Sequence, residues 1–314
     1  MELDQLRTFV SVAEVRSFTR AGVLAHLSQP AISRQIARLE TELGVRLFER
    51  YGRKVELTAD GKLLLPLAKA VISRVDDAAR LLREHAGMVS SRVSLGSTGT
   101  VFAHMLAPLI ASFLKTYPKI RLDLVERDDT LLEEGVFNGE LDCAVVTAWG
   151  STRAAVTHLL TEEIMLVVPS DHPCATRKSV SLAELAEEPF LLPSHSLNMA
   201  NLLTDICRRA GFEPKVPHRA NYIELTKSLI RQGLGIGLIP KMFVGPGTMD
   251  GLVAVRLKER PTRDLQLIYS RERPLSVAAR TLAIHIRTGT QELYAGGIRE
   301  GRSRPAPPPT EILL

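Results

Sequence analysis

The sequence predicts an α/β protein with an N-terminal winged helix-turn-helix, a long linker helix and a larger domain of two lobes. Three observations lead to this prediction. The segment 17–58 predicts a short helix, a tight turn, a second helix and a basic hairpin, and the segment 59–89 predicts one long helix. From residue 90 to residue 295, strands alternate with helices, and this length is large for one sheet. We therefore expect two lobes with a cleft between them.

The helix-turn-helix is predicted from capping residues and apolar spacing. Ser17 and Ser28 suit the N-cap positions of the second and third helices. Pro30 then falls in the first turn of the third helix, where its missing N–H costs little. The residues expected to face the core are Phe18, Ala21, Leu24 and Ala25 in the second helix and Ile32, Ile36, Leu39 and Leu43 in the third.

The opposite face of the third helix is polar and basic, which suits insertion into a DNA major groove. Between residues 28 and 54, six basic residues outnumber three acidic ones. Gln29, Ser33 and Arg34 are expected to reach base edges or adjacent phosphates, because Gln can bond adenine and Arg can bond guanine in two places. The alternative is that the arginines form an ordinary solvated face. The full predicted set for domain 1–58 is Thr19, Ser28, Gln29, Pro30, Ser33, Arg34, Arg38, Arg50 and Arg53.

Within that set, Thr19 and the wing arginines have a different expected role. Thr19 lies at the start of the second helix, and Arg50 and Arg53 lie at the tip of the hairpin. At those places they are expected to hold phosphates or to reach the minor groove.

The linker segment 59–89 predicts a long helix with one narrow apolar stripe. Leu64, Ala68, Val71 and Val75 alternate spacings of four and three, which is typical of a coiled-coil seam. Two such helices side by side would form a dimer. The alternative is an ordinary helix that lies on its own domain.

The domain 90–295 is predicted to hold a mainly parallel sheet, because its strands alternate with helices. We place lobe I at about 90–161 and 265–295, and lobe II at about 162–264. The tail 296–314 is rich in Pro, Gly and Arg and is predicted to be disordered.

Composition and motifs disfavour several classes of protein. Cys143, Cys174 and Cys207 show neither metal-ligand spacing nor a disulfide framework, so we expect buried thiols, a reducing compartment and no metal site. The first ten residues, MELDQLRTFV, lack a signal-peptide pattern, and no apolar run approaches a membrane span. We therefore expect a cytoplasmic protein. No nucleophile elbow or Walker-type loop is present, which leaves no catalytic residue to name.

These motifs together resemble those of the LysR-type transcriptional regulators, over nearly all of residues 1–295. The resemblance rests on FTRA at 18–21, LSQPAISRQI at 27–36, LFER at 47–50 and GLGIGLIP at 233–240. It implies an effector domain like a periplasmic binding protein, and dimers that pair into tetramers. It further implies operator DNA, a small-molecule effector and RNA polymerase as partners, with no cofactor and no membrane.

The effector site is expected where the first strand of the second domain ends. Residues 97–100 open a helix there, and a helix N-terminus offers N–H groups and hydroxyls to an anion. The alternative is that Thr100 only caps this helix. The resemblance favours a site at Thr98 and Thr100, and it adds Thr147. The full predicted set is Ser97, Thr98, Thr100, Thr147, Ser194 and His195, with a small organic anion as the effector.

Three rival functions stay open from the sequence. An enzyme and a solute-binding protein are disfavoured by the missing motifs and the winged helix. An architectural DNA-binding regulator that ignores small molecules is the strongest alternative, since the second lobe could serve as an oligomerisation surface.

Overall fold

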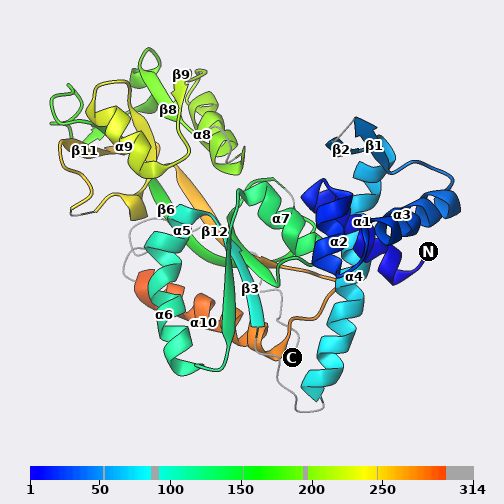
Figure 1. The fold of residues 1–314 in the computed structure, drawn as a ribbon. Coiled ribbons are helices and arrows are strands. Elements are labelled where there is room, and N and C mark those ends of the chain that lie inside the picture. Colours follow the sequence, from blue (N-terminus) through cyan, green and yellow to red (C-terminus); the bar gives the residue numbers. More distant parts are fainter. Residues whose placement is uncertain (52–53, 86–91, 151, 194–196, 246, 295–314) are drawn as a thin grey trace. The chain divides into compact units, whose positions relative to one another are not determined.

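The computed structural model describes residues 1–51, 54–85, 92–150, 152–193, 197–245 and 247–294 (Figure 1). The chain forms two compact units. The N-terminal unit comprises Met1–Ser90, with which Phe137–Glu140 are grouped, and the C-terminal unit comprises Ser91–Val136 and the residues from Leu141 onward. The predicted tail 296–314 lies outside the described residues.

The N-terminal unit is a winged helix-turn-helix followed by one long helix. Its elements are α1 (Leu3–Val15), α2 (Phe18–Ala25), α3 (Gln29–Leu43), β1 (Phe48–Tyr51), β2 (Lys54–Leu57) and α4 (Ala59–His85). The predicted caps are confirmed: Ser17 Oγ accepts from Arg20 N at 3.3 Å, and Ser28 Oγ accepts from Ala31 N at 3.4 Å. Pro30 lies in the first turn of α3, as predicted.

The core of this unit is built on the predicted face of α3. Ile32, Ile36 and Leu39 are buried, and Phe48 packs against the rings of Phe9 and Phe18 at centroid distances of 5.4 and 5.6 Å. Three predicted core residues are wrong. Leu24 is 64% exposed, Leu43 is 38% exposed and Ala25 is also exposed, because each lies in the last turn of its helix, beyond the buried stripe.

The wing is tied to α3 by a side chain that the sequence did not single out. Glu40 Oε1 accepts hydrogen bonds from Leu47 N at 2.7 Å and from Phe48 N at 3.2 Å. Gly61 packs closely against the backbone of the same segment, because a Cβ there would lie 2.2 Å from the Leu47 carbonyl oxygen. These contacts fix the start of the hairpin relative to the third helix.

The first part of helix α4 fits a helix that lies on its own unit, and its later part fits an exposed seam. Its first part packs on its own unit, where Ala68 is buried and Leu64 contacts the core. Its later part leaves Val71, Val75 and Leu82 between 43% and 71% exposed. The later half of the predicted seam is therefore largely exposed in the described part of the chain.

The C-terminal unit is a two-lobed α/β structure around one eight-stranded sheet. Lobe I contains β3 (Arg92–Ser97), α5 (Gly99–Val101), a π-helix (Phe102–Leu106), α6 (Ala107–Thr116), β4 (Arg121–Glu126), α7 (Asp129–Asn138), β5 (Cys143–Thr147) and α10 (Val277–Tyr294). Lobe II contains β7 (Ser179–Val180), β8 (Pro189–Leu192), α8 (Leu197–Arg209), β9 (Lys215–Arg219), α9 (Ile223–Arg231), β10 (Gly237–Pro240) and β11 (Leu252–Leu257), with 3₁₀ turns at Leu182–Leu185 and Lys241–Phe243. The strands β6 (Ala155–Pro169) and β12 (Thr262–Tyr269) are shared, so the lobe limits near 161 and 265 stay predictions.

The prediction of a mainly parallel sheet is wrong. β3 pairs in parallel with β4 and β5, but β12 is antiparallel to β5 and β6, and β6 is antiparallel to β10 and β11. The error arose at β6, a strand of 15 residues. Polar residues in its first half, among them His158 and Thr161, hide the strand pattern there.

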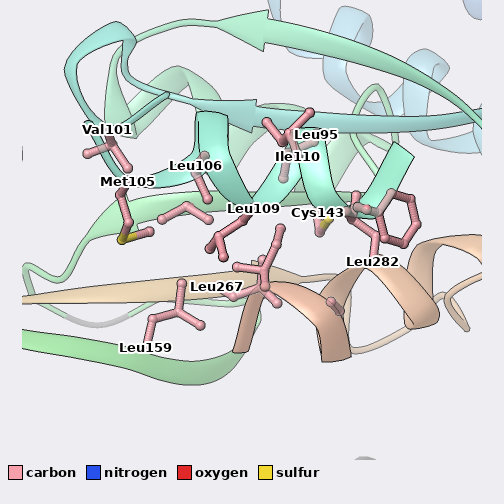
Figure 2. Packing of buried hydrophobic residues seen from close by; sticks show 14 of the residues in the cluster. Leu95, Val101, Met105, Leu106, Leu109, Ile110, Cys143, Leu159, Leu267 and Leu282 are labelled. Carbon is pink, nitrogen blue, oxygen red and sulfur yellow. The ribbon is translucent and has the colours of Figure 1, made fainter. Parts of the chain in front are cut away.

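The core of lobe I lies between the sheet and the helices α6 and α10, which lie side by side in Figure 1. Figure 2 shows Met105, Leu106 and Leu109 on the helical segment that faces Leu267 and Leu282. The same segment, Gly99–Thr116, is long and apolar enough by composition to cross a membrane. Because its apolar side belongs to this core, we assign it as a core helix.

Candidate functional sites

The start of α3 presents its polar side chains to solvent, as predicted. Gln29, Arg34 and Arg38 are exposed, whereas Ser33 is half-buried. Gln29 Nε2 donates a hydrogen bond to Ser33 Oγ at 3.0 Å, which orients the amide at the exposed end of the helix. Ser28 already accepts the capping bond, and Pro30 is exposed beside it.

One turn further along, the two arginines border a shallow hollow. Arg34, Ala37, Arg38, Thr41 and Glu42 line an open space of about 380 Å³. Two guanidinium groups one turn apart suit the phosphates of a DNA backbone. The Glu42 carboxylate accepts from the N-terminal amine of Met1, a contact that sequence spacing did not predict.

The remaining predicted DNA contacts are only partly described. Thr19 is exposed in the first turn of α2. Arg50 lies in β1 opposite Val55, but its side chain is outside the described part of the structure, as is all of Arg53.

In the C-terminal unit, the predicted effector residues lie at the carboxyl ends of parallel strands. Thr98 is the N-cap of α5 but makes no side-chain capping bond, and Thr100 lies half-buried inside α5, two residues later. The alternative reading of Thr100 as the cap is therefore wrong. Ser97 is fully buried and its hydroxyl donates to the Val145 carbonyl oxygen at 3.0 Å, so a structural bond accounts for this side chain. Ser194 and His195 lie outside the described residues.

The helix N-terminus that was expected to hold an anion already faces a carboxylate of the chain. A Cβ built on Gly99 would lie 2.1 Å from Glu126 Oε1. The Glu126 side chain, from the end of β4, therefore packs against the first residue of α5. A second anion at this place would face the negative charge of Glu126, so the structure does not support the expected anion there.

Beside this loop lies a set of polar residues that we call the acidic cluster, made of Asp129, Glu133, Thr147 and Asn198. Asp129 is 1% exposed, and its Oδ1 accepts from Thr147 N at 3.2 Å. Its Oδ2 is buried without a hydrogen-bond partner among the described residues. Burial raises the pKa of Asp129 to about 7, which the bond from Thr147 and the charge of Arg263 only partly oppose.

The acidic cluster connects the two lobes. Asn198, in the first turn of α8, donates from Nδ2 to the Thr147 carbonyl oxygen at 3.0 Å. The Glu133 carboxylate bonds to the side chains of Thr152 and Asn198, and burial raises its pKa above the ordinary value. Of these four residues, only Thr147 is among those predicted from the sequence. Asp129 begins α7 shortly after β4 ends, and no local pattern in the sequence marks it as buried.

A buried ion pair holds the two shared strands together. Arg263 Nη2 lies 2.6 Å from Glu162 Oε1, and the two residues face each other across β12 and β6. Glu162 Oε2 accepts from Met242 N at 2.8 Å, and Arg263 lies 5.0 Å from the centre of the Phe243 ring. Both partners are less than a tenth exposed, so this pair belongs to the core between the lobes.

The cysteines are buried and free, as predicted. Burial raises the pKa of Cys143, and it raises the pKa of Cys207 to about 12. Thiolate chemistry is therefore disfavoured at both positions. Among the residues that the structure describes, no group of three His, Cys, Asp or Glu side chains could hold a metal ion.

Two family models match this chain. Residues 3–62 match the bacterial regulatory helix-turn-helix protein of the lysR family, and residues 86–291 match the LysR substrate binding domain. The DNA-binding transcriptional dual regulator OxyR of Escherichia coli strain K12 is 32% identical over 290 residues, covering 91% of this chain and 95% of that protein.

Solved structures agree with these matches. A cysteine-to-serine variant of OxyR from Corynebacterium glutamicum, bound to H₂O₂, is 28% identical with a TM-score of 0.61 and covers 94% of both chains. Full-length CbnR in complex with its target DNA shares the fold, with a TM-score of 0.63, 24% identity and coverage of 92% of this chain and 99% of that one. The winged helix-turn-helix, the two-lobed C-terminal unit and both family models lead to one conclusion: the chain belongs to the LysR family of transcriptional regulators.

Proposed function

We propose that this protein is a sequence-specific DNA-binding regulator of transcription whose C-terminal unit responds to a small molecule. The observation that carries the DNA-binding part is the start of α3. There Gln29, Arg34 and Arg38 are exposed above the buried stripe of Ile32 and Ile36. Such a helix offers hydrogen-bonding groups to base edges while its other side stays in the core.

The effector is proposed to bind at the carboxyl ends of β3, β4 and β5. Ligands of open α/β sheets bind in the crevice outside the carboxyl ends of the strands. Thr98, Thr100 and Thr147 lie there, and Asn198 approaches from the other lobe. Ser194 and His195 stay predicted contacts from the loop before α8.

The active form is proposed to be a dimer or a tetramer. The exposed side chains of Val71, Val75 and Leu82 on α4 support a seam with a second copy of the chain. Such an oligomer would place two recognition helices on one DNA molecule, with RNA polymerase as a further partner. We propose a cytoplasmic protein that acts by binding rather than catalysis and needs no cofactor.

DNase footprinting on the DNA upstream of its own gene tests the proposal. The wild-type protein is expected to protect one region, and Arg34→Ala to lose about 1–3 kcal/mol of discrimination there. Arg121→Ala is the control, because Arg121 is also an exposed arginine but lies on β4, in the other unit. Equal losses in both variants would contradict the assignment of α3 as the reading helix.

The architectural alternative predicts a different result in the same experiment. If neither the footprint nor the transcript level changes with any added metabolite, a regulator without an effector is favoured. A footprint that changes with one metabolite would favour the effector-controlled regulator.

A further inference from the structure

The buried carboxyl group of Asp129 lacks a partner for one oxygen. Oδ1 receives the Thr147 N–H, but neither a donor nor an acceptor reaches Oδ2 among the described residues. A buried polar atom without a hydrogen bond destabilises the fold, whether the carboxyl is neutral or charged. A ligand that donates a hydrogen bond would remove this cost.

Other carboxylates lie near the strand ends, and those of Glu133 and Asp128 act on the charge of Asp129. Glu133 lies one turn after Asp129 on α7, and Glu126 lies against the first residue of α5. The cation whose charge acts on Asp129 is Arg263, and its guanidinium is already paired with Glu162. The strand ends are therefore acidic, and an anionic ligand would be repelled there.

The arrangement does not suit a metal ion. No three His, Cys, Asp or Glu side chains converge to hold one in the described ranges. The other polar groups at the strand ends are the half-buried Thr98 and Thr100, and Asn198, whose amide donates to the Thr147 carbonyl oxygen. Carboxylates together with such groups suit an organic cation, which donates directed hydrogen bonds and gains a compensating charge.

We propose that the effector carries a protonated amine, which binds to Asp129 at the carboxyl ends of β3, β4 and β5. This inference rests on the proposed function, because it names the ligand class of the same site. The ammonium group donates to Asp129 Oδ2, and Glu133 and Glu126 add favourable charge.

The protonation of Asp129 gives the proposal a signature. Burial raises the pKa of Asp129 to about 7, and the charged groups that act on it are Arg263, Glu133 and Asp128, with Arg127 directed toward α7 at Gly135. Ammonium binding favours the ionised carboxylate, so it releases a proton near neutral pH. The affinity for an amine is then expected to rise about tenfold between pH 6 and pH 8.

The test is a titration of the full-length protein with ethanolamine and ethylenediamine, beside acetate, succinate and glycerol. Trp149 is the only tryptophan of the chain and lies half-buried two residues after Thr147, so its fluorescence reports binding. Both amines are expected to bind saturably and more tightly at pH 8. Asp129→Asn is expected to weaken them roughly tenfold to hundredfold and to abolish the pH dependence.

Glu134→Gln is the matched control, because it removes the same charge from an exposed position on α7. It is expected to bind as the wild type does. If Asp129→Asn does not fold, Glu126→Gln replaces it, and it is expected to weaken amine binding at both pH values. Binding of the carboxylates or glycerol instead, an Asp129→Asn protein with unchanged affinity and pH slope, or no response to either amine overturns the proposal.

A footprint on operator DNA is recorded from the same protein sample. A preserved footprint without an amine response overturns the amine alone. A missing footprint overturns the proposed function of the protein.

Discussion

The recognition face of α3 is exposed to solvent, whereas most of the acidic cluster of the C-terminal unit is buried. Gln29, Arg34 and Arg38 are exposed, so their polar groups stay solvated until a partner binds. Asp129, Thr147 and Asn198 are at most 8% exposed, so any unmet hydrogen bond there has an energetic cost. The comparison teaches that substitutions on α3 affect binding, whereas substitutions between the lobes also affect stability and protonation.

The largest effect is expected at the buried ion pair. Glu162→Gln leaves the Arg263 charge buried without a counter-charge, and this is expected to lower the free energy of unfolding by about 3–5 kcal/mol. Urea unfolding measures the change. Glu184→Gln, which breaks an exposed pair with Arg177, is the control and should leave the midpoint nearly unchanged. Equal midpoints for both variants would show that the pair between the lobes does not stabilise the fold.

A pH effect of intermediate size is expected from Asp129. Its pKa of about 7 in the folded state lies above the ordinary value of 3.8. Between these two pH values the folded state therefore binds more protons than the unfolded state. This contribution to stability is complete below pH 3.8 and is lost as the pH rises through 7, at roughly 2 kcal/mol between about pH 5 and pH 7. The free energy of unfolding of wild type and Asp129→Asn, measured at both pH values, tests this. The same pH dependence in both proteins would contradict a buried carboxyl with a raised pKa.

The wing contact of Glu40 is expected to have a smaller effect. Glu40→Ala removes the acceptor of Leu47 N and Phe48 N, which costs about 1–3 kcal/mol of stability. Because the wing then loses its fixed start, affinity for all DNA sequences should fall together. Thermal unfolding and fluorescence anisotropy on duplex DNA check the two parts. Asp4→Ala is the control, because it removes an exposed carboxylate from the first turn of α1, away from the wing, and it should leave this affinity unchanged.

The smallest effect is expected at the thiols. The pKa values of Cys143 and Cys207 are raised by burial, so the folded protein should react with Ellman's reagent only when it unfolds. Peroxide is then expected to leave the footprint of the protein on its upstream DNA unchanged. Rapid labelling of native Cys143 or Cys207 would contradict this expectation.

The N-terminal unit was predictable because its signals are local. Ser17 and Ser28 cap helices within three residues, and the buried stripe of α3 repeats every three or four residues. The wrong core predictions among its described residues, such as Leu24, lie at helix ends, where periodicity does not show how far the core extends.

The C-terminal site was harder to predict because its contacts are distant in sequence. The Thr147 carbonyl oxygen accepts from Asn198, which is 51 residues away in the sequence. The Thr147 N–H donates to Asp129, which is 18 residues away. Acidic residues in the loop after a strand are usually solvated, so no local pattern in the sequence marks Asp129 as buried. Glu126 caused the converse error, because a helix N-terminus looks open in the sequence although a distant carboxylate lies against it.

The most direct test of the central claim is a pair of affinities for wild type, measured at several salt concentrations. One duplex carries the upstream region of the gene, and the other is random DNA. Exposed base-reading groups on α3 predict that the upstream duplex binds about 10³-fold more tightly or better, with both affinities falling steeply as salt rises. Equal affinities at every salt concentration would contradict a reading helix at Gln29 to Arg38.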